Sequence, residues 1–231
     1  MTGYGRIVLA LVASAFAFAA TAADSADFTA RGNEPGWSIQ KDDAGITFRT
    51  MDGRTVTVSP LPVPQKVDDA DVYRATAAGR SFSLSIMDKV CTDTMSGMFY
   101  PASVTVEVGT EKFAGCGGEP ASLLKGEWLV EKIDGRPIAT ESHPSLNFDV
   151  GNQVNGDSSC NRYFGTYVIT GEGLTISQIG STMMMCEQPL MDQEKAFQSI
   201  LRDTTGFQIG ADGGLTLNAK DGRSIVGRRK G

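Results

Sequence analysis

Near the middle of the chain stands the stretch Cys116-Gly117-Gly118-Glu119-Pro120. Two glycines and a proline disfavour both helix and strand, so we expect regular secondary structure to be interrupted at this stretch. Segments with the pattern of strands lie on both sides of it. We therefore predict two small β-rich domains with a boundary near residue 121, the first over residues 24 to 120 and the second over residues 123 to 229.

The part of the chain before this stretch reads as short strands joined by turns. Apolar and polar residues alternate in Phe82-Ser83-Leu84-Ser85-Ile86 and in Val104-Thr105-Val106-Glu107-Val108. This period of two is typical of strands with one buried face. Turn residues separate further predicted strands at residues 36 to 40, 46 to 51 and 72 to 77.

The second half has a similar strand pattern and one predicted helix. Leu190, Phe197, Ile200 and Leu201 can share one face of a helix over residues 190 to 202, and Pro189 suits an early helical position. The predicted strands are residues 126 to 133, 145 to 150, 163 to 170, 174 to 179, 214 to 218 and 224 to 228. The fold class is therefore mostly β (α+β), with the helix of the second domain packed on an antiparallel sheet or a partly open barrel.

The first residues predict export. An apolar run from Ile7 to Ala20 follows Arg6, and Ala20-Thr21-Ala22 offers a small-x-small cleavage site. The run is short for a membrane span, so we predict a signal peptide over residues 1 to 22 and a periplasmic or secreted bacterial protein. A lipoprotein needs a cysteine directly after such a run, but the first cysteine is Cys91. We therefore expect no lipid anchor.

The charge of the chain argues against several partners. Removal of residues 1 to 22 takes away one cation, Arg6, and no acid, so the formal net charge changes from -6 to -7. Nucleic acids and anionic lipids need clustered lysine and arginine, and the one basic cluster, Arg228-Arg229-Lys230, reads as a solvated tail. We expect a monomer that binds no nucleic acid.

Four cysteines permit three pairings in an oxidising compartment. The pairing of Cys91 with Cys116 and of Cys160 with Cys186 keeps each bridge inside one predicted domain, where it would act as a structural staple. Redox catalysis needs a Cys-x-x-Cys spacing and structural zinc needs closer cysteine pairs or more histidines than His143 alone. The sequence also has no Gly-x-Ser-x-Gly nucleophile motif. We therefore predict neither an enzyme nor a cofactor.

Three polar stretches are candidate recognition loops. Two lie in the first half, Asn33-Glu34-Pro35-Gly36-Trp37 and Asp93-Thr94-Met95-Ser96-Gly97, and one spans residues 156 to 163. Loops often carry function, but Asn, Asp and Ser also bond to nearby backbone groups, and this turn chemistry is the favoured interpretation. Asn161 in particular is expected to bond to the local backbone. The candidate residues are Asn33, Glu34, Trp37, Asp93, Ser96, Asn161 and Arg162.

A methionine cluster offers a different chemistry. In Met183-Met184-Met185-Cys186, thioethers and a thiolate are soft ligands that could hold Cu(I), with Met95, Met98 and Met191 as further donors. Adjacent residues of a strand point to opposite faces, however, and methionine is a common core residue. Core packing is the favoured interpretation, and we predict no metal site.

The second half also resembles a known family. Trp128-Leu129-Val130, Cys160-Asn161-Arg162-Tyr163 and Ser181-Thr182-Met183-Met184-Met185-Cys186, in this order, resemble the META domain of HslJ-like heat-shock proteins over residues 123 to 229. Ser159 departs from the glycine that many members carry. The resemblance implies a non-catalytic domain of envelope and secreted proteins, linked to heat stress, antibiotic tolerance and secretion, with no agreed active site. It also supports the pairing of Cys160 with Cys186.

The first half resembles an uncharacterised envelope domain that is often found in lipoproteins. The resemblance rests on residues 31 to 37, on residues 91 to 97, on Tyr100-Pro101 and on residues 115 to 118. Together these features predict a non-enzymatic envelope protein, related to stress or envelope integrity, which binds an envelope protein or cell-wall component through exposed loops. The alternatives are a secreted inhibitor of a hydrolase such as lysozyme, and copper binding through the methionine cluster.

Overall fold

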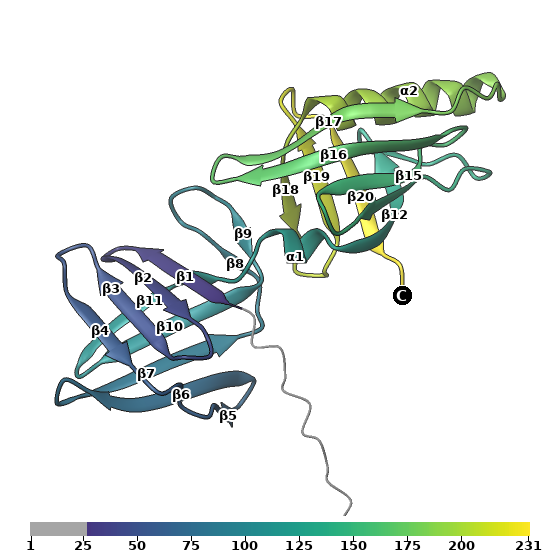
Figure 1. Cartoon of the computed structure of the whole chain (residues 1–231). Coiled ribbons are helices and arrows are strands. Elements are labelled where there is room, and N and C mark those ends of the chain that lie inside the picture. The colour runs from purple at the N-terminus through teal and green to yellow at the C-terminus, as the bar shows by residue number, and fades with distance from the viewer. Residues whose placement is uncertain (1–26) are drawn as a thin grey trace, which may run out of the picture.

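The computed structural model describes residues 27–231, and these residues form two curled antiparallel sheets in succession (Figure 1). The first sheet ends with Gly117, and the short helix α1 (Ala121–Leu124) leads into the second, which begins at Gly126. The mostly β fold class predicted from the sequence is confirmed. The predicted signal peptide, residues 1 to 22, lies outside the described residues.

The first sheet has the strand order β4-β3-β2-β1-β11-β10-β7-β6-β5. Its strands are β1 (Phe28–Asn33), β2 (Gly36–Lys41), β3 (Ile46–Thr50), β4 (Thr55–Val58), β5 (Gln65–Val67), β6 (Ala70–Ala77), β7 (Arg80–Met87), β10 (Ala102–Val108) and β11 (Glu111–Gly117). The apolar residues of the two alternating segments are buried on one face of the sheet. They are Phe82, Leu84, Val104 and Val106, and all belong to one core. The opposite face of β1, β2 and β3 is exposed.

The second sheet has the order β17-β16-β15-β14-β12-β20-β19-β18, with β13 added beside β12. Its strands are β12 (Gly126–Ile133), β13 (Arg136–Pro137), β14 (Ser145–Phe148), β15 (Gln153–Asp157), β16 (Arg162–Thr170), β17 (Gly173–Ser181), β18 (Thr204–Ile209), β19 (Leu215–Ala219) and β20 (Ser224–Arg229). The end strands β17 and β18 contact each other, so the sheet curls into a nearly closed barrel (Figure 1).

Helix α2 (Gln188–Asp203) packs against this barrel over β17 and β19. Pro189 lies in its first turn, where a missing backbone N–H costs nothing, and Phe197, Ile200 and Leu201 are buried. The ring of Phe197 meets that of Tyr163 edge-on, with ring centres 5.4 Å apart. The predicted amphipathic helix is present, extended by about one residue or two at each end, as helix limits commonly are.

A hairpin of the first half joins the two sheets. Its strands β8 (Cys91–Thr92) and β9 (Phe99–Tyr100) pair only with each other, yet Met98 and Tyr100 belong to the same buried cluster as the barrel core. The ring centre of Phe99 lies 6.2 Å from that of Phe207 on β18. The two halves therefore share an apolar contact. Across residues 27–231, no helix has the length and hydropathy needed to cross a bilayer.

Candidate functional site

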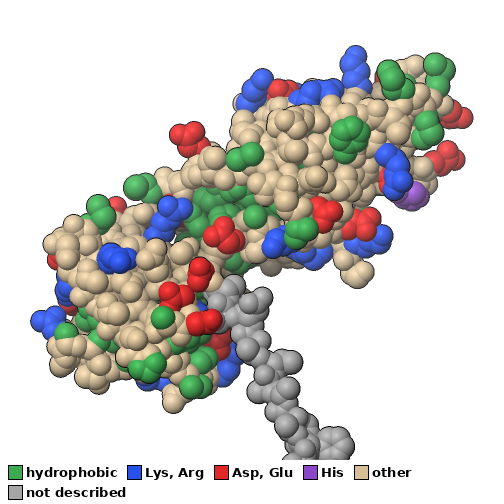
Figure 2. Space-filling model, in the orientation of Figure 1, with side chains coloured by type: hydrophobic (Ala, Val, Ile, Leu, Met, Phe, Trp, Pro, Cys, Tyr) green, Lys and Arg blue, Asp and Glu red, His purple; other side chains and the backbone are tan. Residues whose placement is uncertain are grey.

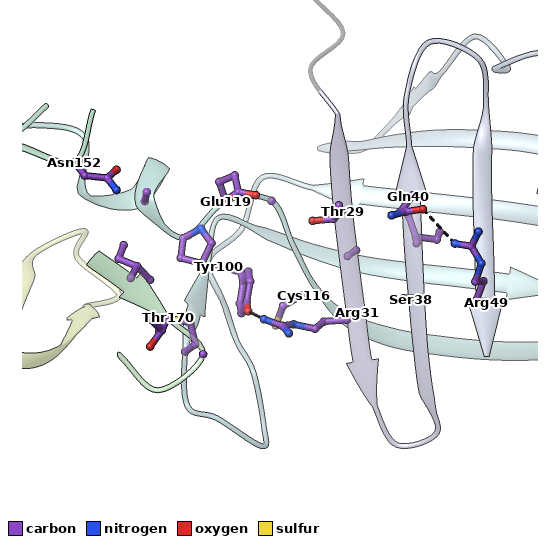
Figure 3. A pocket seen from close by; sticks show the side chains of 18 of the residues that line it. Thr29, Arg31, Ser38, Gln40, Arg49, Tyr100, Cys116, Glu119, Asn152 and Thr170 are labelled. Atoms are coloured by element: carbon purple, nitrogen blue, oxygen red, sulfur yellow. Dashed lines mark hydrogen bonds between the residues drawn. The ribbon is translucent and has the colours of Figure 1, made fainter. Parts of the chain in front are cut away.

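A cleft of about 580 Å³ opens at the junction of the two sheets (Figure 3). The first half contributes the exposed face of β1 to β3, Tyr100 of the hairpin, and the linker residues around Glu119. The second half contributes Asn152, Tyr167 and the turn that begins at Thr170. Hydrophobic side chains gather at the same junction on the molecular surface (Figure 2). The cleft exists only where both halves meet.

The wall formed by the first sheet carries a row of polar side chains. Arg31 on β1 pairs in register with Ser38 on β2, which pairs with Arg49 on β3. Side chains of adjacent strand residues point to opposite faces, so these three project outward while Ile39 and Phe48 lie in the core. Residues of three consecutive strands thus form one line across the sheet.

Both arginines of this row are held by neutral partners. The guanidinium of Arg31 donates a hydrogen bond to the Tyr100 hydroxyl. The guanidinium carbon, Cζ, lies 5.4 Å from the centre of the Tyr100 ring. Nη1 of Arg49 donates to Oε1 of Gln40 at 3.2 Å, as Figure 3 shows. Across the described chain, the arginines that form ion pairs are others, namely Arg54, Arg162, Arg223 and Arg228. The cleft therefore contains two guanidinium groups without a carboxylate partner.

Three of the predicted recognition residues meet at the hairpin loop, outside the cleft lining. Nδ2 of Asn33 donates to Oδ2 of Asp93 at 2.9 Å, and the backbone N–H and hydroxyl of Ser96 each donate to Oδ1 at 2.7 Å. Burial would raise the pKa of the Asp93 carboxyl, but the hydrogen bonds from Ser96, Asn33 and Met95 lower it to about 2. Asp93 thus shapes the loop and ties it to β1, which is the turn chemistry that the sequence favoured. Glu34 is exposed in the neighbouring β1–β2 turn.

Trp37 does not belong to a recognition loop. It lies on β2, is only 4% exposed, and donates from Nε1 to the carbonyl oxygen of Ala114 at 3.2 Å. Trp37 was a candidate recognition residue, but it also belongs to the strand predicted over residues 36 to 40, and the alternation of β2 directs its indole into the core. Trp37 contributes to stability rather than to a binding surface.

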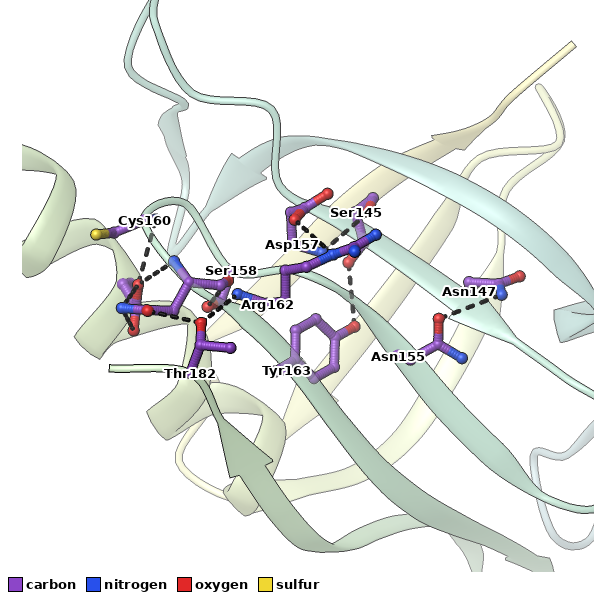
Figure 4. A network of polar contacts seen from close by, with 11 residues as sticks. Ser145, Asn147, Asn155, Asp157, Ser158, Cys160, Arg162, Tyr163 and Thr182 are labelled. Atoms are coloured by element: carbon purple, nitrogen blue, oxygen red, sulfur yellow. Dashed lines mark hydrogen bonds and ion pairs between the residues drawn. The ribbon is translucent and has the colours of Figure 1, made fainter. Parts of the chain in front are cut away.

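Polar contacts connect Cys160 and Thr182 with their neighbours in the second half (Figure 4), and the buried side chain of Asn161 is the centre of this network. Its Oδ1 accepts from the backbone N–H of Met184 at 2.6 Å and from the Thr182 hydroxyl at 2.7 Å. Its Nδ2 donates to Glu194 of α2 at 3.1 Å, and the backbone N–H groups of Cys160 and Asn161 also donate to Glu194. The predicted local bonding is present at the backbone carbonyl of Asn161, which accepts from Ser158, whereas the side chain bonds to two distant segments, the one after β17 and helix α2.

Glu194 was not among the residues predicted from the sequence, although the sequence holds a signal for it. It lies four residues after Leu190 and three before Phe197, within the apolar stripe of the helix, and it is buried. A carboxylate in such a stripe must find hydrogen-bond donors inside the protein. Arg162, the neighbour of Asn161, is instead exposed and forms an ion pair with Asp157 at 3.7 Å. Of the two neighbouring candidates, Asn161 is part of the buried network and Arg162 lies on the surface.

The cysteines form the two pairs that the sequence favoured, Cys91 with Cys116 and Cys160 with Cys186, with Cα atoms 5.5 and 6.0 Å apart. Cys186 therefore has no thiolate to offer a soft metal. Met183 and Met185 are 96% and 92% exposed, so the interpretation of this stretch as core packing was wrong. The stretch follows the end of β17, where no strand continues to bury it.

The comparisons with known proteins concern the second half. Residues 121–230 match the META domain family. The heat shock protein HslJ of Escherichia coli K12 is 26% identical over 101 residues, which cover 43% of this chain and 67% of that protein. A Burkholderia xenovorans protein solved by NMR is 24% identical and covers 48% of this chain and 86% of its own, with a TM-score of 0.41. A second NMR structure is 21% identical, covers 48% and 94%, and has a TM-score of 0.40. Residues 121–230 of this chain are a META domain of the HslJ-like type.

Proposed function

We propose that this chain is a non-enzymatic, exported envelope protein that protects the bacterial envelope under stress by binding another envelope component. The META domain supports a stress-related role, since the curated relative is a heat shock protein. The two disulfides support an oxidising compartment, because such bonds persist outside the cytosol. The apolar run from Ile7 to Ala20 is the basis for export to the periplasm or the medium.

The cleft between the two sheets is the observation that carries the binding role. Ligand sites are concave, they favour junctions between structural units, and they combine apolar walls with a few placed polar groups. This cleft joins the rings of Tyr100 and Tyr167 with the guanidinium groups of Arg31 and Arg49. Asp93, the carboxyl whose pKa is strongly lowered, lies outside the lining of the cleft and accepts hydrogen bonds from Asn33 and from residues of its own loop. The arrangement therefore favours recognition over acid–base chemistry.

A complementation experiment tests this proposal. A deletion strain would be challenged with heat, detergent and antibiotics, and then supplied with the wild type, the Ser38→Trp variant or the Thr57→Trp variant. Ser38 lines the cleft, whereas Thr57 lies exposed on β4 of the same sheet and does not line it. A tryptophan is well tolerated on an exposed strand, so both variants should accumulate and unfold like the wild type.

The expected result is that the deletion strain is sensitive, that wild type and Thr57→Trp restore growth, and that Ser38→Trp does not. A deletion strain as resistant as the parent would contradict the stress role. Full rescue by Ser38→Trp would contradict the role of the cleft.

A further inference from the structure

We propose that the cleft recognises a short acidic peptide segment through Arg31 and Arg49, an inference that rests on the proposed function and names its ligand class. The ligand would be an exposed, extended stretch of an envelope protein that carries two carboxylates on one side. Ser38, which lies between the two arginines, would form the floor under the peptide.

The spacing of the arginine row fits such a segment. Neighbouring strands lie about 4.8 Å apart, so the Cα atoms of Arg31 and Arg49, separated by β2, are about 10 Å apart. Carboxylates on alternate residues of an extended peptide point to one side about 7 Å apart. The long arginine side chains can close the remaining difference, because each guanidinium can swing along its aliphatic stem.

The charge state of the two guanidinium groups points to an acidic partner. A guanidinium offers five N–H donors, and its preferred partner is a carboxylate bound by two parallel hydrogen bonds. Arg54, on the same sheet, already has this partner in Glu111. Arg31 and Arg49 bond only to a phenol and an amide, which leave their charge uncompensated and most of their donors free. The hydrogen bonds to the two neutral partners keep the guanidinium groups near the cleft wall, and they are weaker than the charge-assisted bonds to a carboxylate that would replace them.

The shape and net charge of the protein favour a short peptide over an extended polyanion. A formal net charge of -6 repels a nucleic acid or an anionic bilayer at long range, whereas recognition inside the cleft acts at short range. Most other polar groups of the lining, such as Thr29, Ser38 and Asn152, are uncharged and can bond to peptide N–H and C=O groups. Glu119, on the linker side, is the one carboxylate among the described residues of this lining, so we place the peptide carboxylates away from it, against Arg31 and Arg49.

An NMR titration of the full mature protein tests the inference. The probes are the acetylated and amidated pentapeptide SESES and its uncharged counterpart SQSQS, at low salt. The protein variants are Arg31→Gln and Arg49→Gln. The matched control is Arg74→Gln, because Arg74 also donates to a glutamine on the neighbouring strand, Gln65, at 2.8 Å but lies outside the cleft lining.

We expect SESES, but not SQSQS, to shift the amide signals of the cleft residues. Each cleft variant should weaken binding about threefold to fivefold, as expected for partly exposed ion pairs, and the control variant should leave it unchanged. Equal binding of SQSQS, binding insensitive to both cleft variants, or no binding of SESES would overturn the inference. Equal competition by inorganic phosphate would assign the site to free anions instead. None of these outcomes changes the complementation result with Ser38→Trp, so the two proposals fail separately.

Discussion

Oε2 of Glu194 accepts a hydrogen bond from the backbone N–H of Asn161 at 2.9 Å, so a carboxylate of helix α2 holds the loop that connects β15 to β16. The same oxygen accepts from the N–H of Cys160 at 3.2 Å. The disulfide from Cys160 to Cys186 ties this loop to the segment that precedes the helix. Helix, loop and disulfide are thus connected as one unit.

Removal of the Glu194 carboxylate should destabilise the second half strongly. The Glu194→Ala variant leaves several buried N–H groups without an acceptor, and we expect a loss of about 3 kcal/mol in the free energy of unfolding. Urea denaturation followed by circular dichroism measures this loss. Asp192→Ala, an exposed acidic residue of the same helix, is the control and should change stability by less than about 0.5 kcal/mol. Similar midpoints for the two variants would contradict the structural role of Glu194.

The stability of the first half should depend on pH through Asp93. Its pKa is lowered from 3.8 to about 2, so its charged form is favoured in the folded state. The stabilisation is fully present above the unfolded pKa near 4 and is lost as pH falls through about 2, an effect of about 2 kcal/mol. At pH 7 the urea midpoint of the wild type should exceed that of Asp93→Asn. At pH 2 the midpoints of the two proteins should converge. A difference between the two proteins that stays constant with pH would refute this role.

The contact between the end strands β17 and β18, the seam of the barrel, leaves no room for a side chain at Gly173. This residue has a φ of 141°, and an added Cβ would lie 2.0 Å from the backbone oxygen of Thr205 on β18. The backbone cannot yield without moving the strand, so we expect Gly173→Ala to cost about 3 kcal/mol. Gly171→Ala, in the same turn but with no heavy atom within 4 Å of the added carbon, should be nearly neutral. Thermal unfolding curves of the two variants decide the point, and equal melting temperatures would contradict a tight seam.

The local features of the fold could be predicted because they depend on short-range patterns. The alternation around Leu84 and Val106 indicates half-buried strands whatever the rest of the chain does, and Pro189 with Phe197 and Leu201 marks the helix. Strand β11 was missed, because Gly115 and Gly117 interrupt its pattern. The glycines of β11 allow the backbone of its partner strand β1 to come close, since an added Cβ on Gly115 would lie 2.1 Å from the backbone oxygen of Arg31.

The candidate site could not be predicted, because it depends on the exact register of paired strands and on the packing of the two halves. Arg31 and Arg49 become neighbours of Ser38 only through the pairing of three strands. The cleft itself forms only because the hairpin bearing Phe99 packs against Phe207, more than a hundred residues later. Neither relationship leaves a periodic signal in the sequence, whereas the turn chemistry of Asp93 with Ser96 is local and could be anticipated.

The most direct test of the central claim, that the cleft binds an envelope component, is photo-crosslinking in living cells. A benzophenone amino acid would replace Ser38 inside the cleft or, as the control, Thr57 on the same sheet outside it. The account predicts a covalent adduct from position 38 that disappears when Arg31 and Arg49 are both changed to glutamine, and no such adduct from position 57. No adduct from position 38, or the same adducts from both positions, would contradict it.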